Sequence, residues 1–293
     1  MSEQKRLYYK NNWLFILVLV LFIINVYLFY LDFNGSKKGL TFAMLDVGQG
    51  DALFIESPTG IQVLFDAGPT RSILGPLRQV MSPFDRSIDA VVITNPDADH
   101  IGGLQEILKS YEVGVVLEPG TFNSSKVYEN LKNEIVKKDI KNILAKKGMR
   151  LHLGGGAVID ILFPNQDVSD WNPNDGSVVA KLSYGEISVM LTGDSTTETE
   201  EIILDSYSLE ALDSTILKVG HHGSKTSTSE AFAGAVSPAQ ALISLGKDNK
   251  YGHPNEQTLS TLTSVGAQVF STDLLGTIIM QSNGGNVSFS FKK

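Results

Sequence analysis

The amino-acid sequence predicts an α/β domain of layered sheets and helices, preceded by one apolar segment. Two observations carry this prediction. From residue 40 onward, short apolar runs of strand composition alternate with segments whose apolar residues recur at helical spacing. Many strands that alternate with helices are typical of an α/β fold and argue against an all-β fold. The pattern alone fits two helix-flanked sheets as well as one wound sheet.

The predicted elements follow one another with Gly-containing breaks between them. Strands are expected at residues 41–45, 52–56, 62–65, 89–94, 217–219, 241–245, 269–271 and 277–281, and a hairpin at 177–190. Helices are expected from about His100, around residues 127–135, and at 198–207, 229–236 and 255–265. His152 lies between two leucines and is interpreted as an ordinary strand residue with no role in a site.

The composition limits the chemistry that the chain can perform. Its 293 residues suffice for one large domain or two ordinary ones, and 42% hydrophobic residues exclude a disordered chain. The absence of cysteine excludes disulfide scaffolds, thiolate zinc sites and cysteine nucleophiles. Any bound metal must therefore be held by His, Asp, Glu or Asn side chains.

The charge is distributed unevenly along the chain. Residues 1–38 contain five basic and two acidic residues, a net of +3, whereas the other 255 contain 19 basic and 30 acidic ones, a net of −11. A domain this acidic is not built to hold a polyanion by counterion release alone. If it contacts nucleic acid, we expect a local site or a bridging cation.

The N-terminal region contains an apolar run at residues 13–31, interrupted only by Asn25. As a helix it would extend for about 28 Å, close to the hydrocarbon thickness of a bilayer. A buried core helix is the alternative, but the run has no polar face. The sequence therefore predicts a transmembrane anchor at 13–31 that contacts the lipid bilayer, between a tail at 1–12 and a linker at 32–38.

The charges that flank this run predict its orientation. Lys5, Arg6 and Lys10 precede the run, and the next basic residues follow it only after Asp32. The positive-inside rule then favours a cytoplasmic tail. We expect a single-pass membrane protein whose main domain, at residues 39–293, is extracytoplasmic.

One segment concentrates ionisable groups where an apolar strand gives way to a helix. Asp97, Asp99 and His100 lie within four residues of one another, directly after the strand predicted at 89–94. Strand ends are where α/β folds place their sites, and so many charged groups repel one another unless a cation or solvent offsets them. The alternative is a solvated N-cap in which Asp97 or Asp99 serves the following helix.

Three later segments favour a site over a cap. Asp194 ends another apolar strand, His221 and His222 follow a third, and His253 lies in a Gly-containing turn. Four of the five histidines thus stand in strand-to-loop positions next to glycine, and none belongs to an apolar helical stripe. Two other segments are interpreted as turns: the Gly-rich stretch from Asp46 to Asp51, and residues 174–177, which would lie near the site.

Six motifs occur in an order that resembles a known family. They are LDVGQGD at 45–51, FDAG at 65–68, DADHIGG at 97–103, LTGD at 191–194, KVGHHGS at 218–224 and YGHP at 251–254. Together they resemble metallo-β-lactamase-fold hydrolases, and most of all the hydrolase domain of ComEC-type competence proteins. The resemblance covers residues 40–293. It implies a four-layer αββα sandwich with a metal site at one edge of the two sheets.

The resemblance also implies a ligand set for one or two divalent ions, zinc or manganese. Asp99 and His100 would hold one ion together with Asp194, and His221 or His222 would complete that site. Asp97 and residue 95 would belong to the other ion, with Asp66 nearby as a ligand or as a hydrogen-bond acceptor that orients one. This chain departs from the family pattern His-x-Asp-x-Asp-His at Asn95, because an amide oxygen is a poorer zinc ligand than imidazole. A one-metal enzyme, a weaker two-metal site and a degenerate domain all remain open.

The predicted function is metal-dependent hydrolysis of a phosphodiester, in DNA or in a smaller compound such as a nucleotide. A bound cation lowers the pKa of water towards about 7. Asp99 or Asp194 could accept the proton, and Lys218, Ser224 or His253 could neutralise charge on a phosphoryl oxygen. Structural alternatives are a solvated head for Lys218 and a turn role for His253. The competing hypothesis is a catalytically degenerate, surface-anchored binding or accessory module, which Asn95 favours.

Overall fold

The computed structural model describes residues 13–28 and 39–293 of the chain, which divides into two units, Met1–Lys38 and Gly39–Lys293. In the first unit, residues 13–28 form a helix. The predicted tail at 1–12, the last three residues of the predicted anchor and the linker at 32–38 lie outside the described residues.

The prediction of a single-pass membrane protein is contradicted. Among the helices of residues 13–28 and 39–293, none combines the length and the apolar character that crossing a bilayer requires.

The second unit contains two β-sheets. The eight-stranded sheet has the order β15 (Val287–Lys292), β14 (Thr277–Ser282), β1 (Leu40–Met44), β2 (Leu53–Glu56), β3 (Gln62–Phe65), β4 (Ser87–Val92), β5 (Glu112–Glu118) and β6 (Lys141–Leu144). The seven-stranded sheet has the order β13 (Gln268–Ser271), β12 (Gln240–Ile243), β11 (Ile216–Lys218), β10 (Ile187–Leu191), β9 (Val179–Tyr184), β8 (Ala157–Phe163) and β7 (Arg150–Gly154). The ambiguity between one wound sheet and two sheets is thereby resolved in favour of two.

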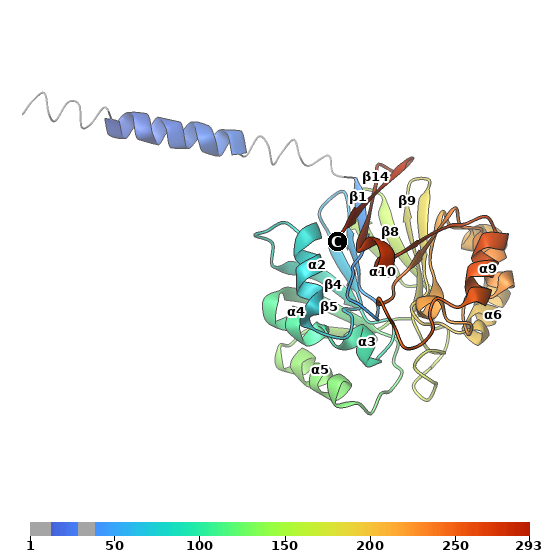
Figure 1. The fold of residues 1–293 in the computed structure, drawn as a ribbon. Coiled ribbons are helices and arrows are strands. Elements are labelled where there is room, and N and C mark those ends of the chain that lie inside the picture. Colours follow the sequence, from blue (N-terminus) through green and yellow to red (C-terminus); the bar gives the residue numbers. More distant parts are fainter. Residues whose placement is uncertain (1–12, 29–38) are drawn as a thin grey trace, which may run out of the picture. The chain divides into compact units, whose positions relative to one another are not determined.

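Helices cover the outer face of each sheet (Figure 1). Those on the eight-stranded sheet are α2 (Leu74–Val80), α4 (Leu104–Ser110) and α5 (Lys126–Lys137), with η1 (Arg71–Ile73) and α3 (Ala98–Ile101) at its edge. Those on the seven-stranded sheet are α6 (Thr197–Ser206), α7 (Leu209–Leu212), α8 (Glu230–Val236) and α9 (Glu256–Ser264). The remaining short helices are η2 (Gly220–Gly223) and α10 (Thr272–Leu275). The unit is therefore an αββα sandwich.

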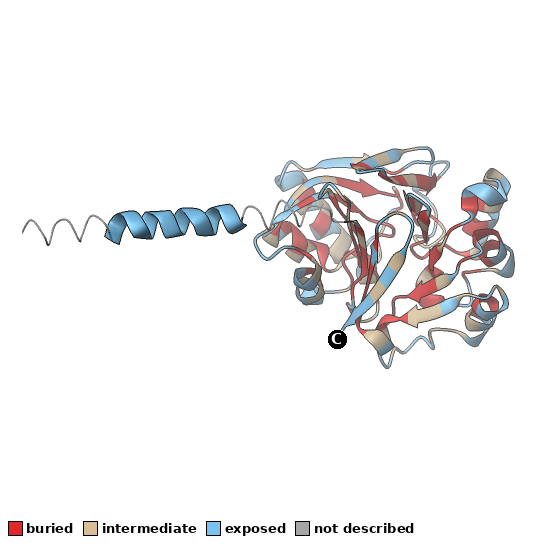
Figure 2. Ribbon diagram, turned by 90° about the horizontal axis from the view of Figure 1, so that it is seen from above, coloured by how far each residue is buried: buried red, intermediate tan, exposed pale blue. Residues whose placement is uncertain are grey.

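Three hydrophobic layers hold the sandwich together, and β1 shows how the sequence encodes them. Leu40, Phe42 and Met44 point into the core between the two sheets, whereas Ala43 packs with the helices on the outer face. Side chains of a strand alternate between its two faces, so both faces of β1 are buried and the strand is nearly all apolar. Figure 2 shows the buried residues concentrated in the sheets and on the inner sides of the helices.

The topology brings the polar strand ends to one edge. Strands β3, β4 and β5 run parallel in the first sheet, and β10, β11 and β12 run parallel in the second. Their carboxyl ends carry the motifs that the sequence singled out, and parallel sheets place ligand sites at such ends. The strands predicted around these motifs are confirmed to within two residues, whereas β5, β6, β7, β8, β15 and α2 were not predicted as elements.

Candidate metal centre

The eight-stranded sheet contributes a fully buried carboxylate–imidazole pair. Asp66 follows β3 with a left-handed backbone (φ 56°), and its Oδ2 lies 2.9 Å from Nδ1 of His100, which sits in α3. Thr94 donates to both Asp66 oxygens, from its backbone N–H at 2.8 Å and from its hydroxyl at 2.5 Å. With Asp66 accepting from Nδ1–H, Nε2 is the nitrogen of His100 that remains for a ligand.

Asp99 lies beside this pair at the start of α3, and its side chain is 36% exposed. The Gly-rich stretch before β2 packs directly against its backbone. A Cβ on Gly50 would lie 2.2 Å from the Asp99 carbonyl oxygen, which also accepts a hydrogen bond from the Asp51 N–H at 3.2 Å. Only glycine permits this approach, so the stretch read as a turn also fixes the position of the loop that carries Asp99.

The seven-stranded sheet contributes Asp194 after β10 and two imidazoles after β11. His221 (φ 46°) and His222 (φ 56°) are both left-handed, a backbone conformation that non-glycine residues adopt rarely and often at functional sites. His222 Nδ1 lies 2.8 Å from the Ser244 carbonyl oxygen after β12 and donates to it. As in His100, Nε2 is therefore the nitrogen that remains for a ligand.

Four donor atoms from the two sheets converge in a set that we call the donor group: Asp99, His100, Asp194 and His222. One ligand atom from each lies within 4.8 Å of the others. Asp194 Oδ2 is 3.1 Å from His100 Nε2 and 3.6 Å from His222 Nε2, and Asp99 Oδ2 is 3.4 Å from His222 Nε2.

The protein leaves several of these atoms without hydrogen bonds. Within the described residues, His100 Nε2, His222 Nε2 and Asp194 Oδ1 are buried and have no hydrogen-bond partner. Buried polar atoms are nearly always satisfied, and two imidazoles with two carboxylates are the donors that zinc and iron accept. The residues present therefore fit a divalent metal ion.

The charges within the donor group are strongly coupled. Burial alone would raise the pKa of Asp194, but His100, His222 and Lys218 hold it well below its usual range. Burial likewise would lower the pKa of His100, yet Asp194 and Asp66 raise it well above its ordinary value. Each group thus favours the charged form of the other. A bound cation would take the place of the imidazole proton as the positive charge next to Asp194.

Asp51 and Lys218 form a buried pair next to the donor group. Lys218 was predicted at the site as a residue that neutralises charge on the substrate, whereas Asp51 was assigned only to a turn. The Lys218 side chain is fully buried, its Nζ contacts Asp51 Oδ2 and donates to the Gly193 carbonyl at 2.8 Å, and it lies 4.0 Å from Asp194 Oδ1. The predicted solvated head of Lys218 is therefore wrong. A place on the substrate side is also excluded, because the ammonium is enclosed by protein. Asp51 belongs to the motif LDVGQGD, but the glycines of this motif led to its interpretation as a turn.

Asn95 and Asp97 do not belong to the donor group. Asn95 is fully buried: its Nδ2 donates to Asn174 Oδ1 at 2.6 Å and to Ser177 Oγ at 3.4 Å, and its Oδ1 accepts from the Asp97 N–H at 2.8 Å. Asp97 Oδ1 accepts from Asn123 Nδ2 at 2.6 Å. Burial and the neighbouring Asp99 raise the pKa of Asp97. Both side chains are thus engaged with the protein.

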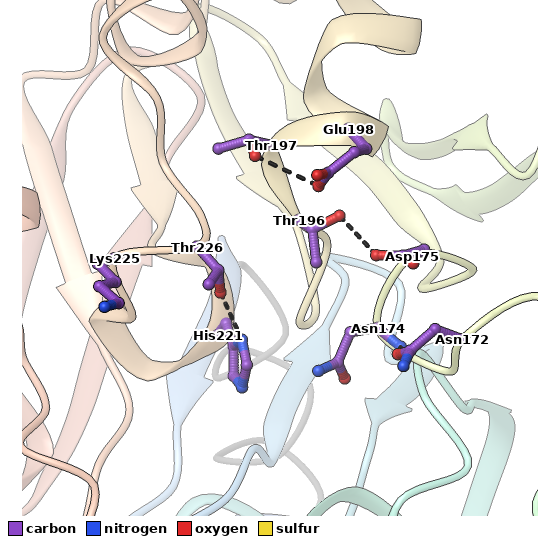
Figure 3. A pocket seen from close by; sticks show the side chains of 9 residues that line it. All are labelled: Asn172, Asn174, Asp175, Thr196, Thr197, Glu198, His221, Lys225 and Thr226. Carbon is purple, nitrogen blue, oxygen red and sulfur yellow. Dashed lines mark hydrogen bonds between the residues drawn. The ribbon is translucent and has the colours of Figure 1, made fainter.

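The remaining predicted residues surround the donor group. His221 Nε2 lies 3.7 Å from Asp194 Oδ2, and the His253 ring centre is 5.8 Å from that of His221. Nδ1 of His253 is buried without a hydrogen-bond partner among the described residues. The Ser224 hydroxyl is hydrogen-bonded within its own loop, to the hydroxyl of Thr226 at 3.0 Å. His221 also lines a cavity of about 520 Å³ (Figure 3).

The fold and the site together define the class of protein. Residues 45–247 match the metallo-β-lactamase superfamily, and the chain belongs to that family. The described residues bear out the predicted αββα sandwich as the hydrolase fold of this superfamily.

The relatives identify a narrower group within this superfamily. The chain is 32% identical over 259 residues to ComE operon protein 3 of Bacillus subtilis (strain 168), covering 80% of this chain and 32% of that protein. It is 30% identical to recombination protein 2 of Haemophilus influenzae, with 83% and 29% covered, and 28% identical to competence protein ComA of Neisseria gonorrhoeae, with 83% and 32% covered. The resemblance to ComEC-type competence proteins is confirmed, and the chain spans about a third of the length of these relatives.

Solved structures support the same fold. CmlA, a diiron β-hydroxylase from Streptomyces venezuelae, superposes with a TM-score of 0.54 at 14% identity, covering 84% of this chain and 54% of that chain. At that identity the likeness concerns the fold alone.

Proposed function

We propose that this protein is a metal-dependent hydrolase of phosphodiester bonds, with a nucleotide or nucleic acid as the substrate. The observation that carries the proposal is the donor group, whose buried nitrogen and oxygen atoms converge without hydrogen-bond partners of their own. The relatives, named as competence and recombination proteins, favour a nucleic-acid phosphodiester over other esters. The net charge of −11 on residues 39–293 favours recognition at a local site over contact along an extended strand.

In this proposal Asp99, His100, Asp194 and His222 hold the ion. When bound, a divalent ion acidifies water and neutralises charge on a phosphoryl oxygen. Asp66 and the Ser244 carbonyl hold the Nδ1–H of the two imidazoles, which keeps their Nε2 atoms directed at the ion. Asp99, which has the most exposed side chain of the four, accepts a proton on the side that solvent reaches.

His253 is proposed to donate a hydrogen bond to the substrate as a neutral imidazole. Burial, with the neighbouring His222 and His221, lowers the pKa of His253, so the ring is uncharged at neutral pH. Its buried Nδ1 has no partner among the described residues, and its ring stacks on exposed Tyr251 at a centroid distance of 5.8 Å. A neutral N–H donor stabilises a phosphoryl oxygen without repelling the cation beside it.

The test is hydrolysis of bis(4-nitrophenyl) phosphate and of single-stranded DNA by the full chain, stripped of metal and reloaded with zinc, manganese or iron. We expect activity to return with metal and to fall by at least about a thousandfold in His100→Ala and Asp194→Ala. His152→Ala is the matched control, because this histidine lies exposed on β7, away from the site. A reloaded chain that hydrolyses neither substrate would contradict the proposal.

The second candidate is a metal-binding accessory module without turnover, and Asn95 is the observation that favours it. Metal content and thermal unfolding separate the two. A ligand at a hundred times its dissociation constant stabilises the native state by about 2.7 kcal/mol. Both candidates predict that stabilisation and its loss in His100→Ala, but only the hydrolase predicts turnover. Failure of metal to bind or stabilise the wild-type chain would contradict both.

A further inference from the structure

The cavity beside His221 is lined entirely by polar side chains. They are Asn172, Asn174, Asp175, Thr196, Thr197, Glu198, His221, Lys225 and Thr226. Its volume of about 520 Å³ falls within the range of small-molecule sites, roughly 300–1,000 Å³, whose walls are usually apolar. Because every lining residue carries a polar group, the cavity suits a ligand that forms hydrogen bonds around its edge.

The cavity adjoins the donor group. His221 lines its wall, and the Nε2 atom of the same ring lies 3.7 Å from Asp194 Oδ2. A substrate whose phosphate lies at the donor group can therefore extend past His221 into the cavity. Figure 3 shows Asn174 projecting towards His221 from the facing loop.

Two asparagines present N–H groups with no protein partner. The Oδ1 atom of Asn174 accepts from Asn95, and that of Asn172 accepts from the Asn174 backbone N–H at 3.0 Å. Both oxygens are thus engaged, whereas neither Nδ2 atom makes a hydrogen bond within the described residues. The two amides are oriented as donors, towards a ligand that carries carbonyl oxygens.

The carboxylates of the cavity limit the charge of that ligand. Asp175 accepts from the Thr196 hydroxyl at 2.7 Å, and Glu198 lies with it on the same wall (Figure 3). Two carboxylates against the single ammonium of Lys225 oppose a second phosphate group. A neutral ring with carbonyl and imino groups meets both the amide donors and the carboxylate acceptors.

We propose that this cavity binds a nucleobase of the substrate, and that Asn95 is the positioning residue that orients Asn174 for the contact. The proposal rests on the phosphodiester function above and assigns the base of its nucleotide or nucleic-acid substrate to this cavity. In this interpretation, the amide at position 95, where the family pattern has histidine, serves substrate selection instead of metal ligation. Its Nδ2 fixes the Asn174 oxygen, so the Asn174 nitrogen faces the base.

The test compares two esters that release the same chromophore. Thymidine 5′-(4-nitrophenyl phosphate) carries a base, and bis(4-nitrophenyl) phosphate does not. We expect Asn174→Ala to lower the ratio of their kcat/KM values by about threefold to tenfold, the loss of one hydrogen bond, with the larger change in KM. Asn133→Ala, on the exposed face of α5, is the matched control and should leave the ratio unchanged.

A second variant tests the role of Asn95. Asn95→Asp keeps an acceptor for the Asp97 N–H but removes the donor to Asn174, whose amide must then turn its nitrogen towards the new carboxylate. The oxygen of Asn174 would face the cavity, and the preference for the thymidine ester should fall at least as far as in Asn174→Ala. A preference that survives in Asn95→Asp would overturn the positioning role.

The outcomes separate this proposal from the general function. If the wild-type chain hydrolyses bis(4-nitrophenyl) phosphate but the ratio is the same in Asn174→Ala, the base-binding proposal is overturned and the hydrolase stands. An abasic deoxyribose ester that responds to Asn174→Ala as strongly as the thymidine ester would also overturn it, because the sugar would then be the bound group. If the wild-type chain hydrolyses neither ester, the general function has failed first.

Discussion

Two buried polar clusters lie at the same edge of the sandwich and solve the problem of burial in opposite ways. In the donor group, His100 Nε2, His222 Nε2 and Asp194 Oδ1 have no hydrogen-bond partner within the described residues. The second cluster is the amide pair of Asn95 and Asn174. Both polar side-chain atoms of Asn95 and the Oδ1 atom of Asn174 form hydrogen bonds within the protein. An unsatisfied buried polar atom costs about 1–3 kcal/mol, so the donor group requires a ligand whereas the amide pair does not.

The contrast gives the substitution at position 95 a physical meaning. A histidine there would have added a donor to the metal ligands, in the family's pattern. Asparagine instead ties the loop after β4 to residues 174–177, the segment before β9. The donor group is therefore suited to a cation. The amide pair is hydrogen-bonded within the protein, and only the Nδ2 atom of Asn174 is left to bind a ligand in the cavity.

The largest effect on stability is expected when Lys218, the buried cationic side chain next to the donor group, is replaced. Lys218→Met would leave Asp51 buried without its counter-charge, and removal of one partner of a buried ion pair destabilises by about 3–5 kcal/mol. We expect that loss in urea unfolding of the metal-free chain. If Lys218→Met unfolds at the same urea concentration as the wild type, the buried carboxylates do not need this counter-charge, and the contrast with the amide pair is wrong.

The control for this variant is a lysine in an exposed pair. Lys109→Met removes the partner of Glu106 on α4, where solvent screens both charges, and we expect almost no change in stability. A Lys218→Met chain as stable as Lys109→Met would show that the buried ammonium does not compensate the carboxylates around it.

The sequence predicted the donor group better than its surroundings. Asp99, His100 and Asp194 follow apolar strands, and the two-residue alternation of such strands fixes their ends. The burial of Lys218 could not be predicted, because lysine is almost never fully buried unless paired and its partner Asp51 is 167 residues away. The network of Asn95 depends in the same way on Asn174, 79 residues distant.

Strands β6 and β15 were missed because their local patterns are weak. Strand β6 has three exposed residues in four, and β15 alternates without a buried residue, so neither shows the apolar run of an interior strand. The membrane prediction rested on the apolar composition of residues 13–31, and no helix of the described residues has the length and apolar character to cross a bilayer.

An intermediate effect is expected at Asp66, which orients His100 from behind. Asp66→Asn keeps the shape, and asparagine tolerates the left-handed backbone at this position. Its amide can donate to His100 Nδ1, which moves the imidazole proton to Nε2 and blocks the lone pair. We expect metal affinity to fall by about tenfold to a hundredfold, measured by competition with a chelator.

The matched control for Asp66 is Asp89, another carboxylate of the eight-stranded sheet, whose Oδ2 accepts from the Gln62 N–H at 2.7 Å. Asp89→Asn should leave metal affinity unchanged because this residue lies in β4, away from the donor group. Equal losses in both variants would mean that Asp66 acts through general stability instead of through the imidazole.

The smallest effect concerns Glu200, a buried carboxylate that the protein satisfies completely. Its two oxygens accept from the backbone N–H groups of Thr228 and, at 2.8 Å, Ser229, and so tie α6 to the segment after the two imidazoles. Burial raises the pKa of Glu200 above 4.5 despite these hydrogen bonds. This is the reverse of Asp194, whose pKa the neighbouring cationic groups hold down.

The sign of the pH dependence follows from that shift. Between pH 4.5 and the raised pKa, the native state binds more protons at Glu200 than the unfolded state, so this group's contribution to stability falls as pH rises through the window. Glu200→Gln removes the titration. We expect urea unfolding to show the stability of the wild type, relative to the variant, growing as pH is lowered towards 4.5. A difference that is flat or of opposite slope would mean that hydrogen bonds outweigh burial at Glu200, and that a satisfied carboxylate behaves like the donor group after all.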